Sequence, residues 1–66
     1  MTTSQFIKQH LDGTTMYRLS KLTGISATNI NNYVSGKAIP SIDKFKEIVK
    51  ALNIHKDDLN NFFYEH

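Results

Sequence analysis

The sequence predicts an all-α domain of five short helices. Apolar residues recur three and four positions apart along most of the chain, as they do on one face of an α-helix. All three glycines fall at the ends of the expected helices, and the single proline falls in a loop. A chain of 66 residues has room for one domain with one modest core. We therefore expect residues 1–66 to form a single compact domain.

The first expected helix begins with a capping box. Thr2 and Gln5 stand three residues apart, so each side chain is placed to bond the backbone amide of the other residue. The apolar face of this helix consists of Phe6, Ile7 and Leu11. Asp12 and Gly13 are expected to end it.

A second helix follows, and a tight turn joins it to a third. Thr14 or Thr15 caps the second helix, which is expected to run to about Thr23. Gly24 can adopt the left-handed conformation that closes a helix, and Ser26 is a good N-cap for the next one. The apolar stripe of the second helix and its turn consists of Met16, Leu19, Leu22 and Ile25.

The third helix, at about residues 27–35, has an unusual polar face. Its narrow apolar stripe consists of Ile30, Tyr33 and Val34. The other positions are small and hydrogen-bonding, namely Ala27, Thr28, Asn29, Asn31, Asn32 and Ser35. A solvated surface helix normally carries glutamate and lysine, whereas asparagine is a poor helix former. This composition therefore favours a face that contacts a polar partner.

The last two helices are also marked by their ends. Pro40 disfavours helix at the residue before it, Ser41 caps the fourth helix, and Asn53 is its expected C-cap. The apolar stripe of the fourth helix consists of Ile42, Phe45, Ile48, Val49 and Leu52. A fifth helix is expected at about residues 56–64, with His55 as a possible N-cap. Its apolar side consists of Leu59, Phe62 and Phe63.

Together these stripes predict the hydrophobic core. Its expected members are Phe6, Ile7, Leu19, Leu22, Ile25, Ile30, Ile42, Phe45, Ile48, Val49, Leu52 and Leu59. A core of this size makes a domain of only marginal stability.

Positive charge is concentrated in the middle of the chain. The net charge is only +2 at pH 7, but residues 14–42 contain Arg18, Lys21 and Lys37 and no acidic residue. Residues 43–66 contain both lysines and acidic residues, among them Asp57 in the first turn of the fifth helix. Such a distribution is expected of a chain whose middle segment faces phosphates. The alternative, that three cations only solvate two short helices, remains open.

The sequence offers no catalytic, metal or cofactor site. There is no cysteine, and His10, His55 and His66 lie on different segments without an acid at metal-ligand spacing. Gly36-Lys37 lacks the preceding glycine and the following Ser or Thr of a phosphate loop. We therefore expect no enzyme and no cofactor. The lack of cysteine, of a signal peptide and of a long apolar run favours a cytoplasmic protein with no membrane contact.

The second and third helices resemble the helix-turn-helix of the phage repressor and Cro-like (XRE-type) family. The matching residues are Leu19, Gly24-Ile25-Ser26, Ile30, Ser35-Gly36-Lys37 and Pro40-Ser41. Ser20 stands where the family usually has alanine, and it is small enough for the same close helix approach. The motif covers about residues 15–35, and the resemblance covers about residues 14–59. It implies a lambda-repressor-like fold and binding to double-stranded DNA.

The resemblance also implies which residues contact DNA. In this family the third helix enters the major groove, while the second lays its N-terminus on a phosphate. The positions that meet base edges are Ala27, Thr28, Asn29 and Asn32. The positions that meet the phosphate backbone are Thr14, Thr15, Tyr17, Arg18, Ser35 and Lys37. Because asparagine pairs with adenine and no Arg or Gln lies on this face, A·T-rich half-sites are expected.

Two functions remain open at this point. The first is a small Cro-like transcriptional repressor of phage or mobile-element type, which binds operator DNA as a homodimer. The second is a modulator on the same fold, which pairs with another repressor and alters its DNA binding. In either case the expected partner surface is the C-terminal tail, with Phe62, Phe63 and Tyr64. The alternative for this tail is that its aromatic rings cover the end of the core.

Overall fold

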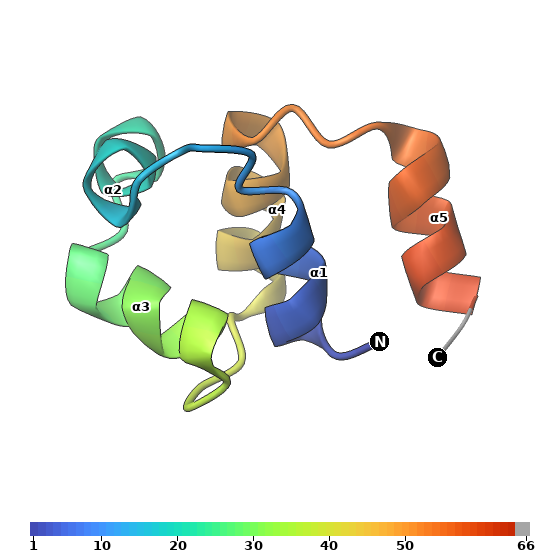
Figure 1. The fold of residues 1–66 in the computed structure, drawn as a ribbon, viewed down its shortest axis with the longest axis horizontal. Coiled ribbons are helices and arrows are strands. Elements are labelled where there is room, and N and C mark those ends of the chain that lie inside the picture. The colour runs from blue at the N-terminus through green and yellow to red at the C-terminus, as the bar shows by residue number, and fades with distance from the viewer. Residues whose placement is uncertain (65–66) are drawn as a thin grey trace.

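The computed structural model describes residues 1–64, which form five α-helices in the expected order (Figure 1). The helices are α1 (Thr3–Gln9), α2 (Met16–Thr23), α3 (Ala27–Ser35), α4 (Ile42–Ala51) and α5 (Lys56–Tyr64). None of these helices is long and apolar enough to cross a membrane. The all-α prediction is confirmed.

Four helices begin at predicted caps. In each, a threonine or serine hydroxyl accepts a hydrogen bond from the backbone N–H three residues later. These caps are Thr2, Thr15, Ser26 and Ser41. The capping box of Thr2 and Gln5 is complete, and Thr15, not Thr14, caps α2. At α5, the Nδ1 atom of His55 accepts the N–H of Asp57 at 3.2 Å, as expected of a cap.

Two helices end earlier than expected. His10, not the Asp12-Gly13 pair, closes α1, where its Nδ1 atom lies 2.9 Å from the carbonyl oxygen of Phe6. Leu52 is the C-cap of α4, and Asn53 follows it in the left-handed conformation with φ 53°. In both cases the polar residue expected to stop the helix lies in the connection after it.

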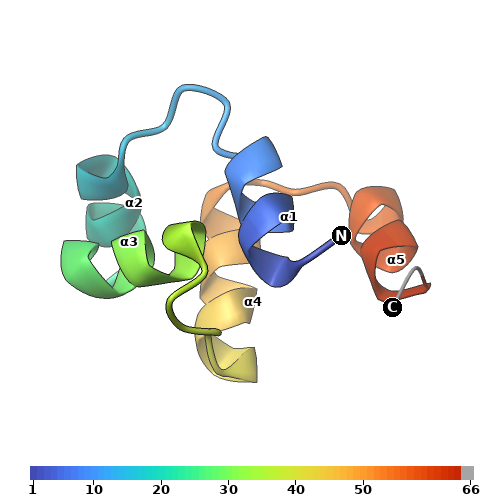
Figure 2. The same cartoon turned by 60° about the horizontal axis from the view of Figure 1, so that its bottom comes forward.

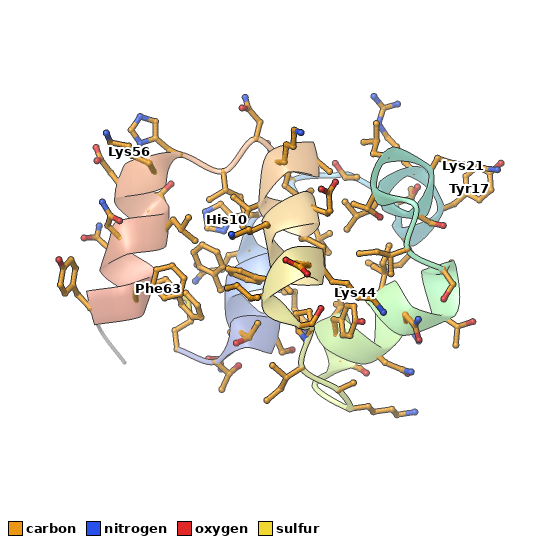
Figure 3. The ribbon with its side chains drawn as sticks, turned by 180° about the vertical axis from the view of Figure 1, so that it is seen from behind. His10, Tyr17, Lys21, Lys44, Lys56 and Phe63 are labelled. Carbon is orange, nitrogen blue, oxygen red and sulfur yellow. The ribbon has the colours of Figure 1, made fainter. Side chains whose placement is uncertain are left out.

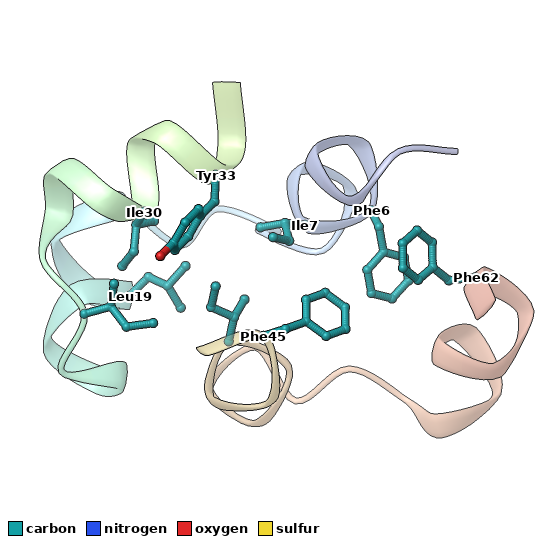
Figure 4. Packing of buried hydrophobic residues seen from close by; sticks show 9 residues of the cluster. Phe6, Ile7, Leu19, Ile30, Tyr33, Phe45 and Phe62 are labelled. Atoms are coloured by element: carbon teal, nitrogen blue, oxygen red, sulfur yellow. The ribbon is translucent and has the colours of Figure 1, made fainter. Parts of the chain in front are cut away.

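The core joins α1, α2, α3, α4 and α5 through nine buried side chains (Figure 4). They are Phe6, Ile7, Leu19, Ile25, Ile30, Tyr33, Phe45, Ile48 and Phe62. Val49, Leu52 and Leu59 are half-buried against this cluster. Tyr33 and Phe62 were not among the expected core residues, although both belong to apolar stripes recognised in the sequence.

The prediction of burial is wrong for two residues. Leu22 is 54% exposed, because the inward side of α2 continues from Leu19 to Thr23, one turn later. The Thr23 hydroxyl donates to the Leu19 carbonyl at 2.8 Å and is thereby satisfied in a partly buried position. Ile42 is 62% exposed, because it is the first residue of α4 and borders an open groove toward α5.

The helices divide the molecule into two ends. α3 packs against α1 and α2, and α2 also packs against α4. α5 lies at the opposite end from α2 and α3, beyond α1 and α4 (Figures 1 and 2). α5 is attached mainly by Phe62, whose ring stacks on that of Phe6 at 4.3 Å between centroids. The Nε2 atom of His10 lies 3.6 Å from the Asp58 carboxylate and adds a polar contact between α1 and α5.

Candidate nucleic-acid interface

The turn between α2 and α3 is built from short-range hydrogen bonds. Gly24 closes α2 with φ 75°, a conformation that favours glycine, and its N–H donates to the Ser20 carbonyl at 2.9 Å. The Thr23 hydroxyl then accepts the N–H of Ile25 at 3.1 Å, and Ser26 caps α3. Ile25 itself is buried. The turn therefore fixes the start of α3 relative to α2 with few degrees of freedom.

One face of α3 is held in the core and the other is exposed. Ile30 is fully buried and Tyr33 is 7% exposed, so they fix the rotation of the helix about its axis. Ala27, Thr28 and Asn29 are exposed in its first turn. The exposed first turn of α3 thus carries a methyl group, a hydroxyl and a carboxamide.

Two further asparagines lie one turn later on α3. Asn31 is exposed and Asn32 is half-buried, and the carbonyl of Asn32 accepts from the N–H of Lys37 at 2.9 Å. Because Asn32 follows Thr28 and Asn29 by four and three positions, it lies on the same side of the helix as both. Base contacts by Ala27, Thr28, Asn29 and Asn32 stay a prediction.

The predicted phosphate-contacting residues of α2 cluster at its N-terminus. Thr15 and Arg18 are exposed, Tyr17 is 68% exposed, and Thr14 is half-buried. The Thr15 hydroxyl accepts the N–H of Arg18 at 3.1 Å as the helix cap, which leaves its own proton free to donate to a phosphate. The N–H of Thr14 already donates to the Leu11 carbonyl at 2.8 Å, so only its hydroxyl is available for such a contact.

The remaining phosphate-contacting candidates follow the last turn of α3. Ser35 and Lys37 are exposed on either side of Gly36, which has φ 84°. The Ser35 hydroxyl donates to the Asn32 carbonyl at 3.3 Å, so part of its hydrogen-bonding capacity serves the end of the helix. The ammonium group of Lys37 forms no ion pair within residues 1–64.

The electrostatics of this end of the molecule suit an anion. The segment from Thr14 to Ile42 contains three cations and no carboxylate. Among the described residues, the contacts of a histidine nitrogen with a carboxylate are His10–Asp58 and His55–Asp57, both at 3.6 Å, and both involve α5 or the residue before it. No carboxylate of the described residues therefore pairs directly with Arg18 and Lys21 on α2 or with Lys37 after α3.

Two features of this interface were not identified from the sequence. The Ser4 hydroxyl of α1 donates to the carbonyl of Val34, which ties α1 to the last turn of α3. The Nζ atom of Lys21 lies 5.2 Å from the centre of the Tyr17 ring, so a cation stands beside the predicted Tyr17 contact (Figure 3). The first contact depends on tertiary packing and has no local signal. The second follows from the i, i+4 spacing of a tyrosine and a lysine on one helix.

The expected partner surface in the tail needs a correction. Phe62 is 5% exposed and stacks on Phe6, so it belongs to the core and is not available to a partner. Phe63 is 53% exposed and Tyr64 is 90% exposed. Consecutive helical positions are about 100° apart, so three adjacent rings at the end of α5 cannot all point inward. Contacts of Phe63 and Tyr64 with a partner stay a prediction.

Residues that could hold a metal ion do not gather anywhere in the described chain. Within residues 1–64, no group of three or more histidine, aspartate or glutamate side chains has a suitable arrangement.

Comparison with known protein families agrees with this geometry. A family model described as "Helix-turn-helix" matches residues 7–59, a range that contains the whole of α2, α3 and α4. No curated protein and no solved structure gave a match. Because the matched range covers most of the chain, the resemblance seen in the sequence is confirmed. The chain belongs to the XRE-type helix-turn-helix family of Cro-like and lambda-repressor-like DNA-binding regulators.

Proposed function

We propose that this protein is a small Cro-like repressor of phage or mobile-element type that reads operator DNA with α3. The observation that carries the proposal is the outward face of α3, where exposed Thr28 and Asn29 lie in a segment without a single acidic residue. A carboxamide can bond both N6 and N7 of adenine, and the methyl groups of Ala27 and Thr28 suit the thymine methyl. A·T-rich half-sites follow from this set of side chains.

The phosphate contacts are proposed to come from both sides of α3. Thr14, Thr15, Tyr17 and Arg18 approach one strand from the start of α2, since the first amides of a helix have no partner within the helix and can bond an anion. Ser35 and Lys37 approach from the end of α3, beyond the reading face. These contacts fix the register of the helix, while the asparagines select the sequence.

A protein with so few contacts gains affinity when two DNA-binding chains act together. The paired chain is either a second copy or another repressor, and the exposed rings of Phe63 and Tyr64 favour a protein contact at the end of α5. A repressor reads two half-sites in the first case. In the second case the protein acts as a modulator whose partner supplies part of the DNA contact.

The test is a titration of the protein with DNA from around its own gene, with random DNA of equal length as the control. A repressor should bind the specific fragment at least about a thousandfold more tightly at physiological salt. When the same fragment is placed upstream of a reporter gene, expression of the reporter should fall in the presence of the protein. Equal affinity for random DNA would contradict operator recognition. Specific binding that appears only after a neighbouring gene product is added would identify the modulator.

A further inference from the structure

An apolar groove lies between α4 and α5, at the end of the molecule opposite α3. Its volume is about 250 Å³. Phe45, Val49 and Leu59 lie deepest in it, since Phe45 is buried and the other two are half-buried. Ile42 and Phe63 form its borders, and Phe63 points from α5 toward the centre of the molecule (Figure 3). We call this feature the α4–α5 groove.

The borders of the α4–α5 groove expose large apolar surfaces to water. Ile42 is 62% exposed and Phe63 is 53% exposed, although both line the apolar groove. The centroids of the Phe63 and Phe45 rings lie 6.3 Å apart in an edge-on arrangement, so Phe45 helps to orient the Phe63 ring. An apolar surface of this kind, shaped by two helices, is typical of a binding site for another protein segment.

Two lysines give this groove a positive border. Lys46 and Lys50 line it and are spaced i, i+4, so their stems lie one helical turn apart on α4. Neither ammonium group forms an ion pair with any residue in the 1–64 range. No carboxylate lines the groove. Long stems of this kind cover apolar surface while their charged ends stay in water.

These features exclude several occupants. Pockets for drug-sized molecules and cofactors usually measure about 300–1,000 Å³, so the groove suits one or two apolar side chains better. Nucleic acid is a poor occupant because the groove offers phosphates only two cations over a carbon surface. A second copy is also disfavoured. A twofold pair presents the same patch from both chains, which would bring Lys46 and Lys50 of each copy into one interface.

We propose that the α4–α5 groove binds an amphipathic helical segment of a different protein, with apolar anchors in the groove and carboxylates beside Lys46 and Lys50. Carboxylates one turn apart on the incoming helix match the spacing of the two lysines. The site lies away from α3, so its occupation is compatible with DNA binding. The proposal does not depend on the proposed repressor function, and it deepens the modulator alternative by stating the chemistry of the partner.

The probe is a synthetic amphipathic helical peptide with leucines along one face and glutamates beside them. A matched peptide has lysine in place of every glutamate. Binding to the full chain is measured by fluorescence anisotropy at about 0.15 M salt, where only close charge pairs survive screening. The acidic peptide should bind at least about tenfold more tightly than the basic one, which corresponds to about 1.4 kcal/mol.

Charge reversal provides the decisive variant. Lys46→Glu with Lys50→Glu should reverse the preference, so that the basic peptide binds more tightly. The control is Lys8→Glu with Lys44→Glu, which makes the same change in net charge at exposed positions outside the groove. This control should retain the preference for the acidic peptide. Ile42→Ser should weaken binding of the acidic peptide several-fold. The protein should stay folded, because Ile42 is largely exposed.

Several results would overturn the proposal. They are the absence of binding by either peptide, equal binding of both, and an equal effect of the two charge-reversed variants. A wild-type dimer in sedimentation that becomes monomeric with Ile42→Ser would place a second copy in the groove instead. Operator DNA titrations on the same variants separate this question from the proposed function, since none of these residues is among the predicted DNA contacts.

Discussion

Helices α3 and α5 have nine residues each and share a pattern of an aliphatic residue, two asparagines and an aromatic residue. The pattern is Ile30-Asn31-Asn32-Tyr33 in α3 and Leu59-Asn60-Asn61-Phe62 in α5. In both helices the aromatic residue is buried, and Leu59 is half-buried where Ile30 is fully buried. The same local pattern therefore sets the same inward side.

The two helices differ in what precedes the pattern and in what holds them. α3 begins with small neutral residues behind the cap Ser26, whereas α5 begins with Lys56, Asp57 and Asp58. Carboxylates in the first turn are stabilised by the helix dipole but repel a phosphate. α3 packs against α1 and α2, whereas α5 is attached chiefly through aromatic rings. The same pair of asparagines therefore stands in different charge and packing surroundings in the two helices, and the proposed DNA contact belongs to α3 alone.

The largest expected difference between α3 and α5 concerns the core residue beneath α3. Ile30→Asp should unfold the protein, because a carboxylate would enter a fully buried site between the two motif helices. We expect a loss of more than about 4 kcal/mol, which is most of the stability of a domain this small. Thermal unfolding followed by circular dichroism measures it. The control Asn31→Asp places the same charge on the exposed side of α3, and an equal loss there would contradict the burial of Ile30.

The attachment of α5 should be weaker but still measurable. Phe62→Ala removes the ring that stacks on Phe6 and should reduce the free energy of unfolding by about 3 kcal/mol. Tyr64→Ala, at a position that is 90% exposed, should change it by less than about 0.5 kcal/mol. Denaturant titration of both variants provides the values. Equal effects of the two changes would mean that α5 is not fixed by Phe62.

Base recognition should distinguish the asparagines of the two helices. Asn29→Ala and Asn32→Ala should each weaken specific DNA binding by about 1–3 kcal/mol and leave binding to random DNA unchanged. Asn60→Ala on α5 is the matched control and should leave both affinities unchanged. If the α3 changes reduce binding to specific and random DNA alike, α3 does not read bases.

The smallest effect concerns a single phosphate contact. Lys37→Ala should weaken binding to all sequences alike and make the salt dependence less steep by about 0.9 in log–log slope. Lys56→Ala removes an equal charge at the start of α5, and the slope should not change there. DNA titrations at several salt concentrations measure both. A slope that depends equally on the two lysines would indicate a general charge effect and no local contact at Lys37.

The sequence predicts the helices well because their ends depend on neighbouring residues. Thr15, Ser26 and Gly24 act within four residues of their partners, so their roles are visible without tertiary structure. Which side chains are buried is harder to predict. Leu22 and Tyr33 both belong to apolar stripes, yet Leu22 is exposed and Tyr33 is buried. A spacing of three or four residues does not fix how far the helix is rotated about its axis, so it does not decide which edge of the stripe faces the core.

Contacts between distant segments have no such local signal. The hydrogen bond from Ser4 to Val34 and the approach of His10 to Asp58 depend on how α1 meets α3 and α5. The candidate DNA-contacting residues came from a family resemblance, and the structure adds their exposure. The α4–α5 groove was not predicted, because its apolar residues come from two helices that meet only in the folded chain, through the rings of Phe45, Phe62 and Phe63.

The exposed side chains at the start of α3 do not hold the fold together. Within residues 1–64, the side chains of Thr28 and Asn29 form no hydrogen bond, and the helix is positioned by Ser26, Ile30 and neighbouring helices. A library randomised at Ala27, Thr28 and Asn29 should therefore yield mostly folded variants. On the proposed function, such variants would differ in operator preference while the scaffold that presents these side chains stays the same.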